Sequence, residues 1–150
     1  MGKDLTEIAL AKGDRVVATS RNLTSLSSLE PLKSTHTPNS LLTIQLDVTN
    51  PAEISNAFFE AKQVFGRVDV VFNNAAVGLF GEVEGTPDEV ARAVFETNFW
   101  GGANVAREAV KFFREVNPPG EGGRLISVSS YGGTVPLGGA GYYCAAKAGA

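Results

Sequence analysis

Short apolar runs alternate with stretches of helical spacing along the whole chain. The apolar runs predict four strands, which cover Arg15–Thr19, Leu41–Leu46, Val68–Phe72 and Arg124–Val128. The third run is apolar apart from Asp69, and a nearly continuous apolar run is typical of a strand buried on both faces of a sheet. Because strands and helices alternate, we predict an α/β fold: a doubly wound parallel sheet with helices on both faces.

Two of the predicted helices begin with the same sequence signal. Asn50-Pro51-Ala52-Glu53 offers an N-cap residue, a proline at the first helical position and a glutamate that caps in return. That helix is expected to end near Phe65. Thr86-Pro87-Asp88-Glu89 repeats the arrangement and predicts one long helix to about Val116.

The rest of the chain is read in the same way. Helices are expected over Leu5–Lys12 and from about Gly141 onward. The stretch Ser20–Ser40 is polar and contains two prolines, so it is expected to be a loop with at most a short helix.

Composition and charge exclude several classes of partner. The 150 residues carry a net charge of −3 and no basic tract, so neither nucleic acid nor an anionic membrane is expected as a partner. No apolar run approaches the roughly 20 residues of a membrane span. The single cysteine, Cys144, fits a reducing compartment. We therefore expect one domain over residues 1–150, located in the cytoplasm. His36 is the only histidine and has no Cys or Asp cluster beside it, so no metal site is expected.

Candidate chemistry is concentrated near the end of the sequence, at Tyr143 and Lys147. Their spacing of four residues places both side chains on one face of the last predicted helix. A free tyrosine is a poor proton donor at neutral pH, and a nearby ammonium makes it a better one by stabilising the phenolate. This pattern alone is weak, because a surface tyrosine beside a solvated lysine would look the same.

Further polar residues accompany this pair. Ser129 and Ser130 directly follow the fourth predicted strand, and the carboxyl ends of strands are where α/β proteins place ligands. Asn98 falls inside the long predicted helix, where asparagine is unfavourable. Spacing alone leaves Asn98 open as an ordinary exposed polar residue.

Taken together, these residues resemble the short-chain dehydrogenase/reductase family along essentially the whole chain. Asn73-Asn74-Ala75-Ala76 is similar to the family's Asn-Asn-Ala-Gly signature, with alanine in place of the glycine. Asn98-Phe99-Trp100-Gly101 resembles its helical Asn-x-x-Gly element. Tyr143-Cys144-Ala145-Ala146-Lys147 matches its tyrosine–lysine motif, and Ser130 lies 13 residues before Tyr143, the family's spacing. The fold implied is Rossmann-like.

The resemblance implies a role for each matched residue. Tyr143 would be the general acid/base, and Lys147 would support it and bind the nicotinamide ribose. Ser130 would hydrogen-bond the substrate carbonyl oxygen, and Asn98 would hold a water that links Lys147 to solvent. Of the neighbouring residues, the resemblance assigns cofactor contacts to Asp47, Val48, Asn74 and Ala75, with Asp47 and Val48 beside the adenine.

The resemblance also implies a ketoreductase, an oxidoreductase that interconverts a small-molecule carbonyl and its alcohol. An apolar substrate is expected, because the predicted pocket mouth is formed by Leu79, Phe80, Val135, Pro136, Leu137 and Gly138. By resemblance, the protein would form a homo-oligomer through its long helix and its final helix.

The segment after the first predicted strand favours NADP over NAD. NAD-binding folds place an acidic residue there to bind the ribose 2′-hydroxyl. Here the sequence reads Ala18-Thr19-Ser20-Arg21, and a guanidinium beside a small hydroxyl residue suits a 2′-phosphate. The alternative is an arginine in a solvated loop.

The chain departs from the family at both ends. The family's first strand and its glycine-rich phosphate-binding turn are missing, with Gly2 as the one candidate remnant, and the sequence stops three residues after Lys147. Without the central strand, we expect the first two predicted strands to lose their link to the last two. We expect these 150 residues alone to lack activity, and NADPH binding with ketone turnover by this chain would overturn that. Two alternatives stand: an incompletely recorded oxidoreductase, or an inactive remnant that acts as a binding or assembly partner.

Overall fold

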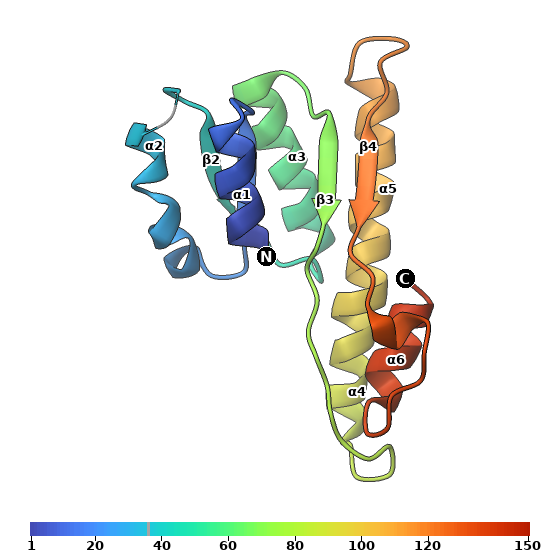
Figure 1. Ribbon diagram of the computed structural model, residues 1–150. Helices are drawn as coiled ribbons and strands as arrows, with labels where there is room; N and C mark the ends of the chain where they lie inside the picture. The colour runs from blue at the N-terminus through green and yellow to red at the C-terminus, as the bar shows by residue number, and fades with distance from the viewer. Residues whose placement is uncertain (36) are drawn as a thin grey trace. The chain divides into compact units, whose positions relative to one another are not determined.

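The computed structural model describes residues 1–35 and 37–150 (Figure 1). His36, and with it any role in metal binding, lies outside the described residues. In order along the chain, the elements are α1 (Gly2–Ala11), β1 (Val16–Ser20), η1 (Leu23–Leu29), α2 (Leu32–Thr35), β2 (Leu41–Gln45), α3 (Pro51–Phe65), β3 (Val70–Asn73), α4 (Asp88–Phe95), η2 (Glu96–Gly101), α5 (Gly102–Glu115), β4 (Arg124–Ser127), η3 (Tyr131–Gly133) and α6 (Gly141–Ala148).

All four predicted strands are present, and they pair in parallel as two separate sheets. β1 pairs with β2, with Val16 opposite Leu41, and β3 pairs with β4, with Val70 opposite Arg124. The expected loss of the link between the first and second pairs is therefore confirmed. The residues divide into two compact units, one of 1–47 and 52–68 and the other of 48–51 and 69–150, and each is described by itself.

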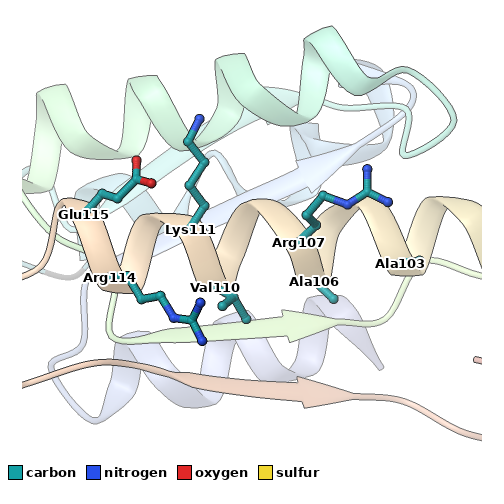
Figure 2. Close-up of a pocket in the computed structure, with 7 residues that line it drawn as sticks. All are labelled: Ala103, Ala106, Arg107, Val110, Lys111, Arg114 and Glu115. Carbon is teal, nitrogen blue, oxygen red and sulfur yellow. The ribbon is translucent and has the colours of Figure 1, made fainter.

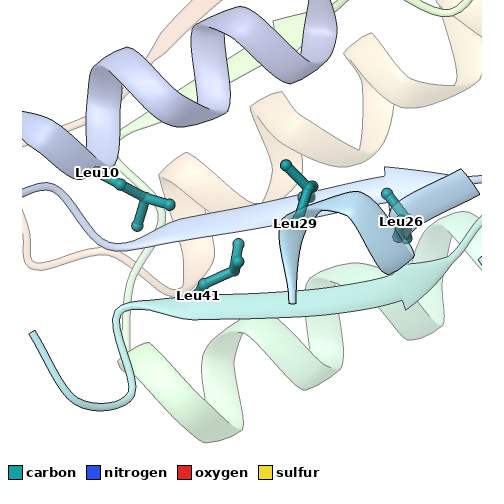
Figure 3. Close-up of a cluster of buried hydrophobic side chains, with 5 residues drawn as sticks. Leu10, Leu26, Leu29 and Leu41 are labelled. Atoms are coloured by element: carbon teal, nitrogen blue, oxygen red, sulfur yellow. The ribbon is translucent and has the colours of Figure 1, made fainter. Parts of the chain in front are cut away.

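The first unit holds β1 and β2 between helical layers. Its core is formed by side chains from α1, η1 and both strands, with α3 on the opposite face of the sheet (Figure 3). The buried residues of this core are Leu10, Ala18, Leu26, Leu29 and Leu41. Helices thus cover both faces of this strand pair, as the alternating pattern predicted. At the edge of the unit, the Arg15 guanidinium lies 5.4 Å from the centre of the Phe65 ring, a cation–π contact.

The segment from Ser20 to Ser40 is more ordered than the sequence predicted, because η1 and α2 both form within it. The Asn22 side chain caps η1 by accepting a hydrogen bond from the Thr24 amide at 2.9 Å. Leu26 and Leu29 are then buried on one side of η1. A cap and two buried leucines therefore stabilise η1, and the prolines that suggested a loop, Pro31 and Pro38, lie outside η1 and α2.

The second unit contains β3, β4 and the helices that follow them. α5 packs against both strands. The prediction that the third strand is buried on both faces is wrong here: Val70 is 49% exposed and the other three residues of β3 are half-buried. Among the described residues β3 pairs only with β4, so neighbours on its other edge do not shield it from solvent.

The long predicted helix is present but not uniform. α4 and α5 are joined by η2, a stretch of π-helix over Glu96–Gly101 that contains Asn98. A π-turn inserts an extra residue into the helical repeat, and such insertions occur frequently at functional sites. The helix starts predicted from Pro51 and near Gly141 are confirmed.

Candidate active site

Lys147 fixes α6 to the end of β4. Its side chain is only 6% exposed, and its Nζ donates a hydrogen bond to the backbone oxygen of Val128 at 3.0 Å. Val128 lies one residue beyond β4 and two residues before Ser130. A lysine is seldom buried without a partner, so this bond explains how the ammonium is held inside the unit, beside the segment that carries Ser130.

Ser130 caps the short turn η3, which packs on α6. Its Oγ accepts a hydrogen bond from the Gly132 amide at 3.2 Å, and the side chain is half-buried. Two glycines permit the close packing. A Cβ on Gly132 would lie 3.2 Å from Cε1 of Tyr143, and one on Gly133 would lie 2.9 Å from the backbone oxygen of Lys147. The structure thus brings Ser130, Tyr143 and Lys147 to one place, on two elements in direct contact.

A Gly133→Ala substitution is expected to lower the free energy of unfolding by about 1–3 kcal/mol, because its methyl group would push η3 away from the α6 backbone. Gly138→Ala is the matched control in the same glycine-rich segment, since a Cβ there meets nothing within 4 Å. Urea denaturation of both variants measures the difference. Equal stability of the two would show that the approach of η3 to α6 is not as close as described.

Asn98 is buried rather than exposed, which decides between the two alternatives that the sequence left open. It is 3% exposed. Its Oδ1 accepts from the Val77 amide and its Nδ2 donates to the Val77 oxygen, both at 2.8 Å. The side-chain amide of Asn98 therefore pairs with both backbone polar groups of Val77, as a neighbouring strand would. These two bonds connect the segment after β3 to η2. The water that the resemblance assigns to Asn98 stays a prediction.

The Asn-Asn-Ala-Ala segment begins with Asn73, the last residue of β3. Asn73 donates from Nδ2 to the Gly102 oxygen at 3.0 Å, which ties the end of β3 to the first residue of α5. Asn74 is half-buried and Ala75 is exposed. Val48 is 6% exposed and packs on Gly101, where a Cβ would lie 2.7 Å from its Cγ2. Val48, Asn74 and Ala75 therefore lie in the same unit as Tyr143.

Arg21 and Asp47 belong to the first unit. Arg21 is exposed directly after β1, and its backbone oxygen accepts from Gln45 Nε2 at 3.2 Å. The Asp47 amide donates to Oε2 of Glu53 at 2.7 Å. This bond joins the end of β2 to the first turn of α3, a role for Glu53 that the predicted helix cap did not include.

Contacts between two loops were missed by the sequence reasoning. The Gly81 amide donates to the Gly139 oxygen at 2.7 Å, and a Cβ on Gly141 would lie 2.8 Å from Val83 Cγ2. The Phe80 ring is stacked beside the Tyr143 ring, with centroids 6.4 Å apart. The glycines were visible in the sequence, but nothing in the spacing indicated which loops they would join.

One hollow of this unit lies away from the predicted site residues. A shallow groove of about 610 Å³ runs along α5 and contains none of the predicted site residues (Figure 2). It is lined by Ala103, Ala106, Arg107, Val110, Lys111, Arg114 and Glu115. The open groove follows one helix face, whereas the polar groups suited to proton transfer gather where α6 meets η3. We therefore place the candidate active site at that junction.

The described part of the chain lacks two kinds of feature. Residues 1–35 and 37–150 contain no group of three or more His, Cys, Asp or Glu side chains that could hold a metal ion. Within the same residues, no helix has both the length and the apolar character needed to cross a membrane.

Parallel strand pairs flanked by helices, with polar groups at the carboxyl ends of β3 and β4, define a Rossmann-like α/β protein. Residues 1–150 match the family model described as short chain dehydrogenase, and the chain belongs to this family. An uncharacterized oxidoreductase of Schizosaccharomyces pombe is 38% identical over 136 residues, which are 91% of this chain and 43% of that protein. The relative that shares this family with the chain is thus named an oxidoreductase.

Solved structures show the same fold. A short-chain dehydrogenase/reductase from Burkholderia phymatum in complex with NAD aligns with a TM-score of 0.90 at 23% identity, over 99% of this chain and 51% of its own. ElxO with NADP bound aligns with a TM-score of 0.87 at 25% identity, over 99% of this chain and 58% of its own. The chain thus spans about half the length of the relatives it matches.

Proposed function

We propose that the whole protein is an NADP(H)-dependent oxidoreductase that interconverts a ketone and an alcohol at the junction of α6 and η3. The observation that carries this proposal is the bond from Lys147 Nζ to the Val128 oxygen at 3.0 Å. It holds the helix of Tyr143 against the segment of Ser130, so that a proton donor, an ammonium and a hydroxyl share one site. Membership of the family supports the reaction type.

In the direction of reduction, the reduced cofactor, when bound, supplies a hydride to the carbonyl carbon. Tyr143 gives its phenolic proton to the carbonyl oxygen, so hydride plus proton convert the ketone to the alcohol. The Ser130 hydroxyl donates a hydrogen bond to the same oxygen as its negative charge develops. Lys147 stabilises the resulting phenolate with its positive charge, and reprotonation from solvent by way of a water at Asn98 restores the site.

Several structural features fit these roles. Lys147 is held by one bond to Val128, which leaves two of its three ammonium protons for a ribose hydroxyl and for other partners. Asn98 is held by both the oxygen and the nitrogen of its side-chain amide, so the backbone around Val77 is fixed beside η2. A rigid scaffold around the reacting groups is what efficient proton transfer requires.

We further propose NADP rather than NAD, because Arg21 follows Ser20 directly after β1. A guanidinium binds a phosphate through two parallel hydrogen bonds, and no acidic residue stands at this position to bind a 2′-hydroxyl. Arg21 is exposed and so accessible to a ligand. One solved relative carries NAD and another carries NADP, so the relatives do not favour either cofactor. The proposal of NADP therefore depends on Arg21.

Replacing Arg21 with alanine is expected to raise the KM for NADPH by about 10-fold or more and to leave the KM for NADH nearly unchanged, because a charge-assisted bond to the 2′-phosphate is lost. Arg15→Ala is the matched control, since Arg15 lies over Phe65 in the same unit. Initial rates with both cofactors measure the ratio. A parallel change in both KM values would contradict the assignment of Arg21 to the phosphate.

The proposed function as a whole is tested by incubating the whole protein with NADPH and a generic ketone such as acetophenone. One molecule of alcohol is expected for each NADPH consumed. NADPH binding without any alcohol would instead favour the alternative, an inactive family member that acts as a binding or assembly partner. A cytoplasmic location, an apolar substrate and assembly of copies through the long helix and the final helix are further parts of this proposal.

A further inference from the structure

Phe80 is an exposed aromatic residue beside the proposed proton donor. Its side chain is 75% exposed, yet its ring stacks with the ring of Tyr143 at a centroid distance of 6.4 Å and an angle of 24°. Offset-stacked aromatic pairs have centroids about 4.5–7 Å apart. The Phe80 ring therefore lies beside the Tyr143 ring, nearly parallel to it, and most of the Phe80 side chain is accessible to a ligand.

The backbone on the C-terminal side of Phe80 holds it at this place. The next residue, Gly81, donates its amide to the Gly139 oxygen at 2.7 Å, two residues before α6 begins. Val83 packs so closely on Gly141, the first residue of α6, that a Cβ there would lie 2.8 Å from its Cγ2. Both loops lie at the α6 end of the unit (Figure 1). Phe80 is thus attached to the helix that carries Tyr143.

We propose that Phe80 is a specificity-determining residue that selects carbonyl substrates carrying an aromatic ring beside the reacting carbon. This inference rests on the proposed function, in which Tyr143 protonates the carbonyl oxygen. The flat group of such a substrate lies against the Phe80 ring while its oxygen meets the Tyr143 hydroxyl. An aromatic pair contributes more than the burial of equal apolar area, so a saturated ring of the same size gains less from Phe80.

The test uses the whole protein with NADPH and two matched ketones, acetophenone and cyclohexyl methyl ketone. Phe80→Leu retains apolar bulk and removes the ring. It is expected to lower kcat/KM for acetophenone about 5-fold relative to cyclohexyl methyl ketone, as the loss of one aromatic pair predicts. Phe80→Tyr should keep the wild-type ratio. Phe59→Leu is the control, because Phe59 is another exposed phenylalanine, in the other unit.

Equal losses for both ketones would overturn the inference and show that Phe80 serves only as apolar packing. Calorimetric binding of the same ketones to the protein–NADPH complex gives a readout that needs no turnover. A wild-type protein that binds acetophenone more tightly than its Phe80→Leu variant, without reducing it, would support the role of Phe80 and contradict the proposed function. Unchanged relative affinities would overturn the role of Phe80 whether or not the protein is active.

Discussion

Replacing Tyr143 with phenylalanine is expected to lower kcat by about 1,000-fold while NADPH affinity changes little. The substitution removes only the phenolic hydroxyl, so the stacking with Phe80 and the packing against Gly132 are retained. General acid catalysis by a positioned side chain contributes about 100- to 10,000-fold, and no other phenol is assigned to the substrate oxygen. Initial rates with NADPH and acetophenone, together with an NADPH titration, measure both quantities.

Tyr142→Phe is the matched control for this substitution. Tyr142 is the preceding residue on α6 and is also half-buried, but it has no role in the proposed reaction. It should retain activity within about 3-fold, as expected for a residue outside the reacting groups. If both tyrosine variants lost activity equally, the effect would come from damage to α6 and not from a lost proton donor.

Replacing Lys147 with methionine is expected to have the second large effect, a loss of about 100-fold or more in kcat/KM. In the proposed reaction this ammonium supports the phenolate and binds the ribose, so the variant removes both contributions. Stability should change far less, within about 1 kcal/mol. The Val128 oxygen loses its donor, which costs about 1–3 kcal/mol for a buried group, but a charge no longer has to be kept at a site that is only 6% exposed, and the two effects offset each other.

The contrast between activity and stability is what makes this variant informative. Urea denaturation gives the free energy of unfolding, and initial rates give kcat/KM. Lys111→Met serves as the control, because Lys111 is exposed on α5 and lies outside the candidate active site. A Lys147→Met protein that unfolds several kcal/mol more easily would contradict the offset and would assign Lys147 a structural role instead.

Much of the fold could be predicted from local sequence signals. Pro51 and the glutamate after it fixed the start of α3, and apolar runs located all four strands to within one or two residues. Such signals act over a single turn or a single strand, so a sequence displays them directly. The π-helix around Asn98 could not be seen in this way, because the partner of the Asn98 side chain is Val77, 21 residues away in sequence.

In the candidate site, too, local features could be predicted from the sequence and long-range contacts could not. The spacing of Tyr143 and Lys147 indicated a shared helix face, and the structure confirms the helix. The bond from Lys147 to the Val128 oxygen and the approach of Gly133 to the α6 backbone were not predictable. Both contacts depend on how η3 packs on α6, and Gly132 and Gly133 permit this packing. The sequence showed that this segment is rich in glycine, but not which element the glycines would contact. Phe80 was expected at the mouth of a pocket, but its stacking on Tyr143 required the pairing of Gly81 with Gly139.

The most direct test of the proposed hydride transfer measures where the hydrogen transferred from NADPH is found in the product. The whole protein is incubated with acetophenone and with NADPH that carries deuterium at the transferred position of the nicotinamide, and the alcohol is analysed by mass spectrometry. The account predicts one deuterium on the carbinol carbon with the wild-type protein, and about 1,000-fold less labelled alcohol with Tyr143→Phe. Absence of labelled alcohol from the wild-type protein, or equal labelling by the Tyr143→Phe variant, would contradict the assignment of hydride transfer and proton donation to this site.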